Sequence, residues 1–163
     1  MLALRRAAAF AAADVDTVRL VLAPSSVRVC DIVAPRTGLE AKFSVRTLAA
    51  MALLDRETGL PSSFGDAVAR DADVGTLRAR ISVEGRAGQD VAESRATIVL
   101  RDGRVLESTF DERSADRDPQ RRSARTRKKF AALTAPLLGA QEAAALEAHV
   151  FALEESASVD LRP

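Results

Sequence analysis

The segment GLEAKFSVRTLAAMALLDRETGL, Gly38–Leu60, places three chemically distinct side chains before a long apolar stretch. Ser44 is suited to cap a helix, because its hydroxyl can accept from the free amides of the first turn. A helix N-terminus favours negative charge, and Lys42 just before it adds to the preference for a carboxylate. An ordinary core helix that starts after a surface lysine has the same residues, so the segment alone leaves both interpretations open.

Few other residues of the chain are suited to catalysis. It has one His, one Cys, and no Tyr or Trp. We expect His149 to lie half-buried in an amphipathic helix, and Cys30 to be a small half-buried residue rather than a reactive thiol. No Gly-rich phosphate loop or nucleophile elbow is present, and one Cys with one His makes a zinc site unexpected. The sequence alone therefore gives no sign of a metal site, a phosphate-binding loop or a catalytic triad.

The run RRSARTRKK, Arg121–Lys129, is the strongest concentration of charge. It lacks interleaved aromatic residues, and the acidic residues between Asp111 and Asp118 offset it, so we interpret it as a solvated helix face. The whole chain carries 24 basic and 23 acidic residues, which gives no general attraction for nucleic acid or anionic membranes. No apolar run is long enough to span a membrane. We read the alanine-rich start as a helix rather than a signal peptide, and expect a cytoplasmic protein.

The periodicity of the chain predicts one α+β domain over residues 1–163, with an N-terminal helix in 1–14 and the domain body in 15–163. An antiparallel sheet of about four strands is expected, with one face covered by helices. Strands are predicted at 17–22, 27–33, 80–85, 94–101 and 105–110, the last two joined by a type I′ turn at Asp102-Gly103. Helices are predicted at 2–13, 44–54, 62–70, 71–79, 123–138 and 140–156, the rest being loops or extended chain.

Several helix ends have sequence signals. Gly59 is expected to provide a left-handed cap after the apolar helix, before Pro61. Ser62 or Ser63 is expected to cap the next helix, and Asp71 or Asp73 the one after it. An interruption or kink is expected near Pro136, and Gly139 should end that helix.

The stretch PRTGLEAKFSVRTLAAMALLD resembles a segment of the MmgE/PrpD family, usually written P-x-T-G-x-E-A-K-F-S-x-x-Y-x-x-A-x-A-L. The matching residues are Pro35, Thr37, Gly38, Glu40, Ala41, Lys42, Phe43, Ser44, Ala49, Ala52 and Leu53. Three further stretches follow in family order: VGTLRARISVE, TIVLRDGRVLES, and DPQRRSARTRKKFAAL with Pro119, Ser123, Lys129 and Phe130. The resemblance runs from about residue 15 to the end.

The resemblance implies a class of chemistry. The family includes 2-methylcitrate dehydratases, cis-aconitate decarboxylases and iminodisuccinate epimerases, which act on small polycarboxylates without metal or organic cofactor. Its members have a large helical domain and a smaller α+β domain, with the active site in the cleft between them. This chain resembles only the smaller, C-terminal domain.

The resemblance also implies site residues and a partner. Lys42, Ser44 and Thr47 would face the cleft and bind substrate, with Lys42 attracting a carboxylate. The family's usual active-site Tyr aligns with Thr47, and the His and Asp residues of the helical domain have no counterpart. We therefore expect a chain that is inactive alone and completes the cleft with a helical-domain partner. The alternative is a non-enzymatic homodimerising module or a degenerate remnant, and we expect a homo-oligomer in either case.

Overall fold

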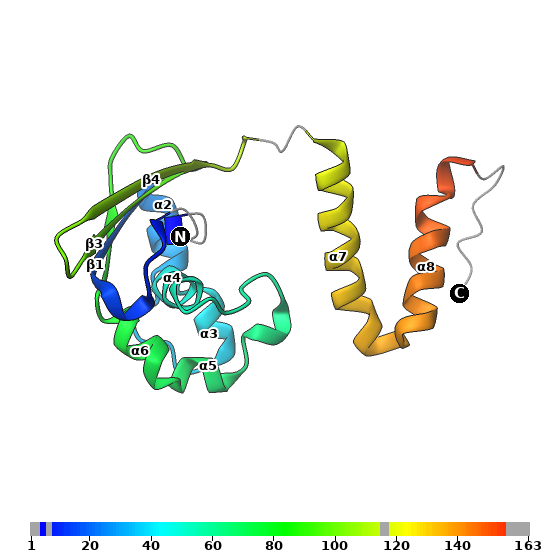
Figure 1. Ribbon diagram of the computed structural model, residues 1–163, viewed down its shortest axis with the longest axis horizontal. Coiled ribbons are helices and arrows are strands. Elements are labelled where there is room, and N and C mark those ends of the chain that lie inside the picture. The colour runs from blue at the N-terminus through cyan, green and yellow to red at the C-terminus, as the bar shows by residue number, and fades with distance from the viewer. Residues whose placement is uncertain (1–3, 6–7, 115–117, 156–163) are drawn as a thin grey trace. The chain divides into compact units, whose positions relative to one another are not determined.

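A mixed four-stranded sheet forms the frame of the N-terminal half of the computed structural model, which describes residues 4–5, 8–114 and 118–155 (Figure 1). The strands are β1 Val15–Leu22, β2 Ile81–Gly85, β3 Glu93–Leu100 and β4 Val105–Asp111, in the order β2-β1-β3-β4. β3 pairs antiparallel with both β1 and β4, whereas β1 and β2 are parallel. The predicted α+β class and a sheet of four strands are confirmed, but the sheet is mixed rather than wholly antiparallel. The parallel pair arises because helices fill the long connection from β1 to β2.

The helices of that connection gather on one side of the sheet (Figure 1). They are α2 Pro24–Cys30, α3 Gly38–Lys42, α4 Val45–Leu53, α5 Asp66–Arg70 and α6 Ala72–Arg78; the short 3-10 helices η1 Ala12–Asp14 and η2 Pro61–Ser63 complete this half. α4 is the central helix, and Ala50, Met51 and Leu53 are almost completely buried. They join Val18 and Ile98 of the sheet in one hydrophobic core.

The predicted strand at 27–33 is wrong, because residues 24–30 form α2. Pro24 occupies the first turn of this helix, where its fixed φ and missing N–H cost nothing. The alternation of Val27 and Val29 suggested a strand, but Val29 is exposed and both neighbours of β1 are other segments. Residues predicted as a loop before Ser44 form α3, whose first turn is capped by Thr37.

Three further turns differ from the sequence prediction. α4 ends at Leu53, and Asp55, not Gly59, adopts the left-handed conformation that follows it, with φ 60°. α5 has Gly65 as its N-cap, so Ser62 and Ser63 do not cap it. In the hairpin turn only Gly103 has positive φ, at 88°, so the turn is not type I′, which needs two such residues.

The remaining predictions for this half hold well. β1, β2 and the β3–β4 hairpin lie within a few residues of their predicted positions. Ser44 caps α4, and Asp71 caps α6 by accepting from the amides of Asp73 and Val74. The predicted helix at 2–13 falls partly outside the described residues.

The C-terminal part of the chain forms a helical hairpin. Contacts divide the chain into the compact units Met1–Ser114 and Ala115–Pro163, so the predicted single domain stays a prediction. The hairpin consists of α7 Pro119–Leu138, α8 Ala140–Phe151 and the 3-10 helix η3 Leu153–Glu155. Gly139 ends α7 as predicted, with φ 84°, whereas α7 continues past Pro136. The predicted extended C-terminus lies outside the described residues.

Polar and cation–π contacts join the two helices of the hairpin. Arg127 donates to Glu147 at 2.7 Å, and its guanidinium lies 3.6 Å from the centre of the Phe151 ring. The basic residues of 121–129 are exposed, as a solvated helix face requires. No described helix is long and apolar enough to cross a membrane.

Candidate functional site

The segment with Lys42, Ser44 and Thr47 folds as two helices with a sharp break between them. Thr37 caps α3 by accepting from the amide of Glu40 at 3.2 Å, and the helix lasts only to Lys42. Phe43 closes α3, and Ser44 begins α4. The break leaves the Lys42 side chain exposed at the end of α3. A single helix start, as the sequence suggested, would not separate Lys42 from α4 in this way.

Ser44 and Thr47 are both completely buried. The Ser44 hydroxyl oxygen accepts from the Thr47 backbone amide at 3.2 Å and from the Thr47 hydroxyl at 2.9 Å. The two side chains therefore satisfy each other at the first turn of α4. The structure brings Ser44 and Thr47 into contact, whereas Lys42 lies at the surface. Substrate binding by these three residues stays a prediction.

A partly buried ion pair fixes the start of α4, and sequence reasoning missed it. Arg46 donates from Nε to Asp31 Oδ1 at 2.6 Å and from Nη2 to Oδ2 at 3.0 Å, in the two-bond geometry favoured by arginine and carboxylate. Its third contact is a bond to the backbone oxygen of Ile81. Nothing in the sequence indicates this pair, because its two residues are fifteen positions apart, one at the end of α2 and the other at the start of α4.

The backbone next to this ion pair also holds the break in place. The Ile32 amide donates to the Phe43 oxygen at 3.1 Å, and Asp31 forms an isolated bridge with Ser44. The loop after α2 therefore lies along the α3–α4 junction. Val33 follows directly in sequence after Ile32, the residue bonded to Phe43.

The surface beside Lys42 is more apolar than an ordinary solvated surface. Val33 is 59%, Leu39 66% and Phe43 43% exposed. Leu39 and Phe43 are four residues apart around α3, with Lys42 between them in sequence. We call Val33, Leu39, Lys42 and Phe43 the junction surface. It combines one cation with exposed apolar side chains.

Gly38 lets α3 approach the loop before α5. A Cβ atom at this position would lie 1.9 Å from the Phe64 backbone oxygen, a distance no side chain can adopt. The Gly38 amide donates to Asp66 Oδ1 at 2.8 Å, which joins α3 to the first residue of α5. The glycine of the quoted motif is therefore explained by close backbone packing rather than by ligand contact.

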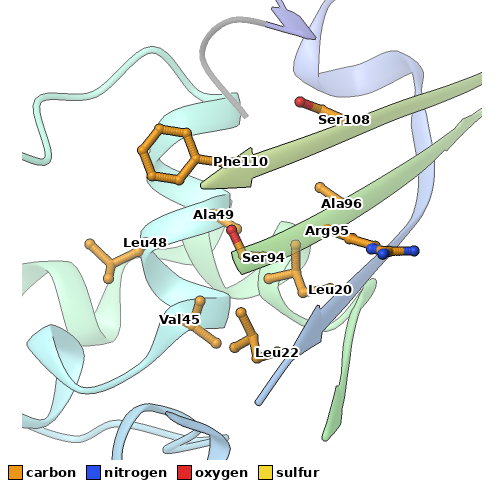
Figure 2. Close-up of a pocket in the computed structure, with 10 residues that line it drawn as sticks. All are labelled: Leu20, Leu22, Val45, Leu48, Ala49, Ser94, Arg95, Ala96, Ser108 and Phe110. Carbon is orange, nitrogen blue, oxygen red and sulfur yellow. The ribbon is translucent and has the colours of Figure 1, made fainter. Parts of the chain in front are cut away.

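A separate hollow lies between α4 and the inner face of the sheet (Figure 2). It encloses roughly 220 Å³ and is lined mainly by apolar side chains, among them Val45, Leu48 and Phe110. It exists because small residues stand opposite each other, as Ala96 and Ser108 do on β3 and β4. Lys42, Ser44 and Thr47 do not line it. Ser94, Ser108 and Arg95 are the polar residues of its lining, and the rest of the lining is apolar.

The described residues offer little for acid–base catalysis. His149 is exposed in α8, so the prediction of a half-buried histidine is wrong. Cys30 is half-buried as predicted, although it lies in α2 rather than in a strand. No described group of three His, Cys, Asp or Glu side chains is arranged to hold a metal ion.

The resolved pKa shifts of described carboxyl groups are all downward, and arginine contacts contribute to each. A hydrogen bond from Arg56 and another from the Val74 amide lower the pKa of Asp71. The Arg19 guanidinium likewise lowers the pKa of Glu84, and Arg113 that of Asp111. Lowered pKa values mark stable carboxylates in ion pairs rather than a general base tuned toward neutral pH.

A comparison with known protein families matches most of the chain. The family model described as "MmgE/PrpD C-terminal domain" matches residues 1–155. A comparison with curated proteins found no match.

Proposed function

The chain belongs to the MmgE/PrpD family as its C-terminal domain, and we propose that it forms one wall of a polycarboxylate-binding cleft. A helical domain of the same family would form the other wall and supply the acid–base groups. The reaction would be a cofactor-independent elimination, decarboxylation or epimerisation of a small polycarboxylate, of the kind that 2-methylcitrate dehydratases and their relatives carry out. Alone, the chain would be inactive.

The exposed Lys42 carries the proposal. Lys42 is the exposed last residue of α3, Leu39 and Phe43 near it in sequence are exposed as well, and no ion pair among the described residues involves it. A second domain closing over this junction surface would bury the apolar groups and exclude water from the cation. A lysine in such a site attracts a carboxylate more strongly than it does in bulk water.

The chemistry of the family explains why a second domain is needed. Removing a proton beside a carboxylate needs a base within hydrogen-bond reach and donors that stabilise the developing enolate. This chain has no Tyr, and its only His is exposed in α8. We assign no catalytic residue to it, and give Lys42 the role of holding substrate.

Affinity purification of the tagged chain from its native host, followed by mass spectrometry, tests the proposal. We expect a stoichiometric helical partner of the same family, and turnover of a tricarboxylate by the purified pair. In that pair Lys42→Ala should raise KM by roughly tenfold or more, because a hydrogen-bonded charge contact to the substrate is lost. Lys128→Ala, which removes an exposed lysine of α7, is the control.

Two results would count against this function. One is recovery of the chain without any helical-domain protein, together with no turnover when the two are combined. The other is an unchanged KM in the Lys42→Ala pair. Recovery of the chain only with itself would favour the alternative, a homodimerising interaction module without enzymatic activity.

A further inference from the structure

Within the described part of the unit Met1–Ser114, the outer edge of β4 has no strand paired with it. β4 is last in the order β2-β1-β3-β4, so among the described residues no strand pairs with its far side. It is seven residues long and contains no Pro or Lys, and the charged side chains that could discourage pairing with another chain are Glu107 and Asp111. The opposite edge of the sheet, formed by β2, is partly covered. The Arg46 guanidinium donates a hydrogen bond to the Ile81 oxygen of β2, and α2 packs against Gly85.

We propose that β4 pairs antiparallel with β4 of a second copy of this chain, around a two-fold axis at Ser108. The two four-stranded sheets would then join into one sheet. This inference stands on the strand edge alone and does not rest on the proposed function.

The pairing of β3 with β4 determines which β4 residues are free to pair with another strand. The Leu100 amide donates to the Arg104 oxygen at 2.9 Å, and β3 continues with Ile98 opposite Leu106. Hydrogen-bonded pairs recur at every second position of an antiparallel ladder. The even-numbered residues of β4 therefore bond to β3, and the odd-numbered ones, 105 to 111, direct their N–H and C=O groups to the open edge.

Charge selects one register for the second copy. Two odd-numbered residues must face each other, so the longest overlaps are centred on residue 107, 108 or 109. Centring on 107 sets Glu107 against Glu107, and centring on 109 sets Glu107 against Asp111. Directly opposed like charges destabilise a strand pair. Only the register centred on Ser108 avoids them, and it sets Glu107 against Thr109 and uses all seven residues.

The same register brings apolar side chains together on one face of β4, although Val105, which is 57% exposed, faces Asp111 of the second copy on the other. It places Leu106 opposite Phe110 of the second copy, on the inner face that β4 shares with the hollow. Phe110 is 63% exposed in the single chain. The Leu106–Phe110 positions form non-hydrogen-bonded pairs, in which side chains approach more closely. Two-fold symmetry makes this contact twice.

Thr109→Glu tests the pairing in the full-length chain by sedimentation equilibrium. The new carboxylate would face Glu107 of the second copy twice per dimer, so we expect roughly a tenfold rise in the dimer dissociation constant. Within its own chain, residue 109 lies opposite Arg95 of β3, which favours a carboxylate and protects the fold. Circular dichroism with thermal unfolding should show that the variant remains folded.

A matched control and a rescue make the test specific for the register. Thr17→Glu introduces the same charge on β1, an interior strand that no second copy can reach by edge pairing. It should leave the dissociation constant unchanged. Glu107→Lys combined with Thr109→Glu sets opposite charges against each other and should restore the dimer. A monomeric wild-type chain at all measurable concentrations, equal weakening by the two single variants, or failure of the rescue would each overturn the proposal.

Discussion

At the scale of single residues, Arg46 and Asp31 form the least exposed ion pair among those described. Their side chains are 17% and 12% exposed. Burying two charges gains little net stability, but removing one partner leaves an uncompensated charge and is costly. The pair links the start of α4, the end of α2 and the edge of β2, and so holds the junction that carries Lys42.

Arg46→Met should lower the free energy of unfolding by about 2 kcal/mol, because the partly buried Asp31 keeps its charge but loses the hydrogen bonds from its partner. Urea denaturation followed by circular dichroism measures the change. Arg70→Met is the control: Arg70 faces Asp66 across 3.6 Å at the surface, and its loss should cost about 0.5 kcal/mol or less. Equal losses in the two variants would contradict a special role for the Arg46 pair.

Asp71 links stability to pH. Its pKa is lowered by the hydrogen bond from Arg56 and by the Val74 amide that it caps. A lowered folded-state pKa gives stability that is present above the ordinary value of 3.8 and is lost as pH falls through the folded value. Protonation below pH ~4 therefore removes this contribution.

Asp71→Asn should keep a capping side chain but lose the charge. At pH 6 we expect the variant to be about 1 kcal/mol less stable than the wild type in denaturant titrations. The difference should shrink toward zero as the titration is repeated down to pH 2. A difference that is the same at both pH values would mean that the charge of Asp71 does not contribute.

At the scale of elements, two glycines have opposite roles. Gly38 begins α3 where its backbone touches the Phe64 oxygen, so any Cβ must push α3 away from the loop before α5. Gly75 lies inside α6, and a Cβ atom added there would meet no other atom within 4 Å. This second glycine therefore only lowers the helix propensity of α6.

Gly38→Ala should therefore lower the free energy of unfolding by about 3 kcal/mol, since the close backbone contact cannot relax without moving α3. Gly75→Ala should raise it by about 0.5–1 kcal/mol, because alanine is the better helix former. Thermal unfolding of both variants gives the comparison. If both variants were stabilised, the approach of α3 to the Phe64 oxygen could not be as close as described.

At the scale of the whole molecule, the two compact units differ in how many apolar side chains each of them buries. Unit Met1–Ser114 contains the sheet, α4 and nearly all fully buried apolar side chains. In the described part of the hairpin only Ala143 is buried. α8 has 12 residues, a length at which an isolated helix is marginal in water, and the longer α7 also depends mainly on the packing of its apolar face for stability.

A chain ending at Ser114 should therefore unfold cooperatively, with near-native β-sheet content in circular dichroism. The excised segment 115–163 should be mostly unfolded in dilute buffer, because its helices bury too little apolar surface. Strong, cooperative helicity of the excised segment would show that the hairpin is stable without any other surface.

The sequence by itself determined the family, the α+β class, the β3–β4 hairpin, and the caps at Ser44 and Asp71. These depend on short-range chemistry: alternation of apolar residues, capping hydroxyls and carboxylates, and a glycine in a turn. The motif around Lys42 was also sufficient to single out the junction, because its residues are consecutive.

Only the tertiary structure decided how that junction is built. Val27 and Val29 alternate as a strand would, yet β2 and β3 already occupy both sides of β1, so the segment forms α2. Burial of Ser44 and Thr47, exposure of Lys42, and the pairing of Arg46 with Asp31 depend on where distant segments meet. Local sequence carries no information on such contacts, since they are fixed by packing across the fold and by the need to pair buried charges.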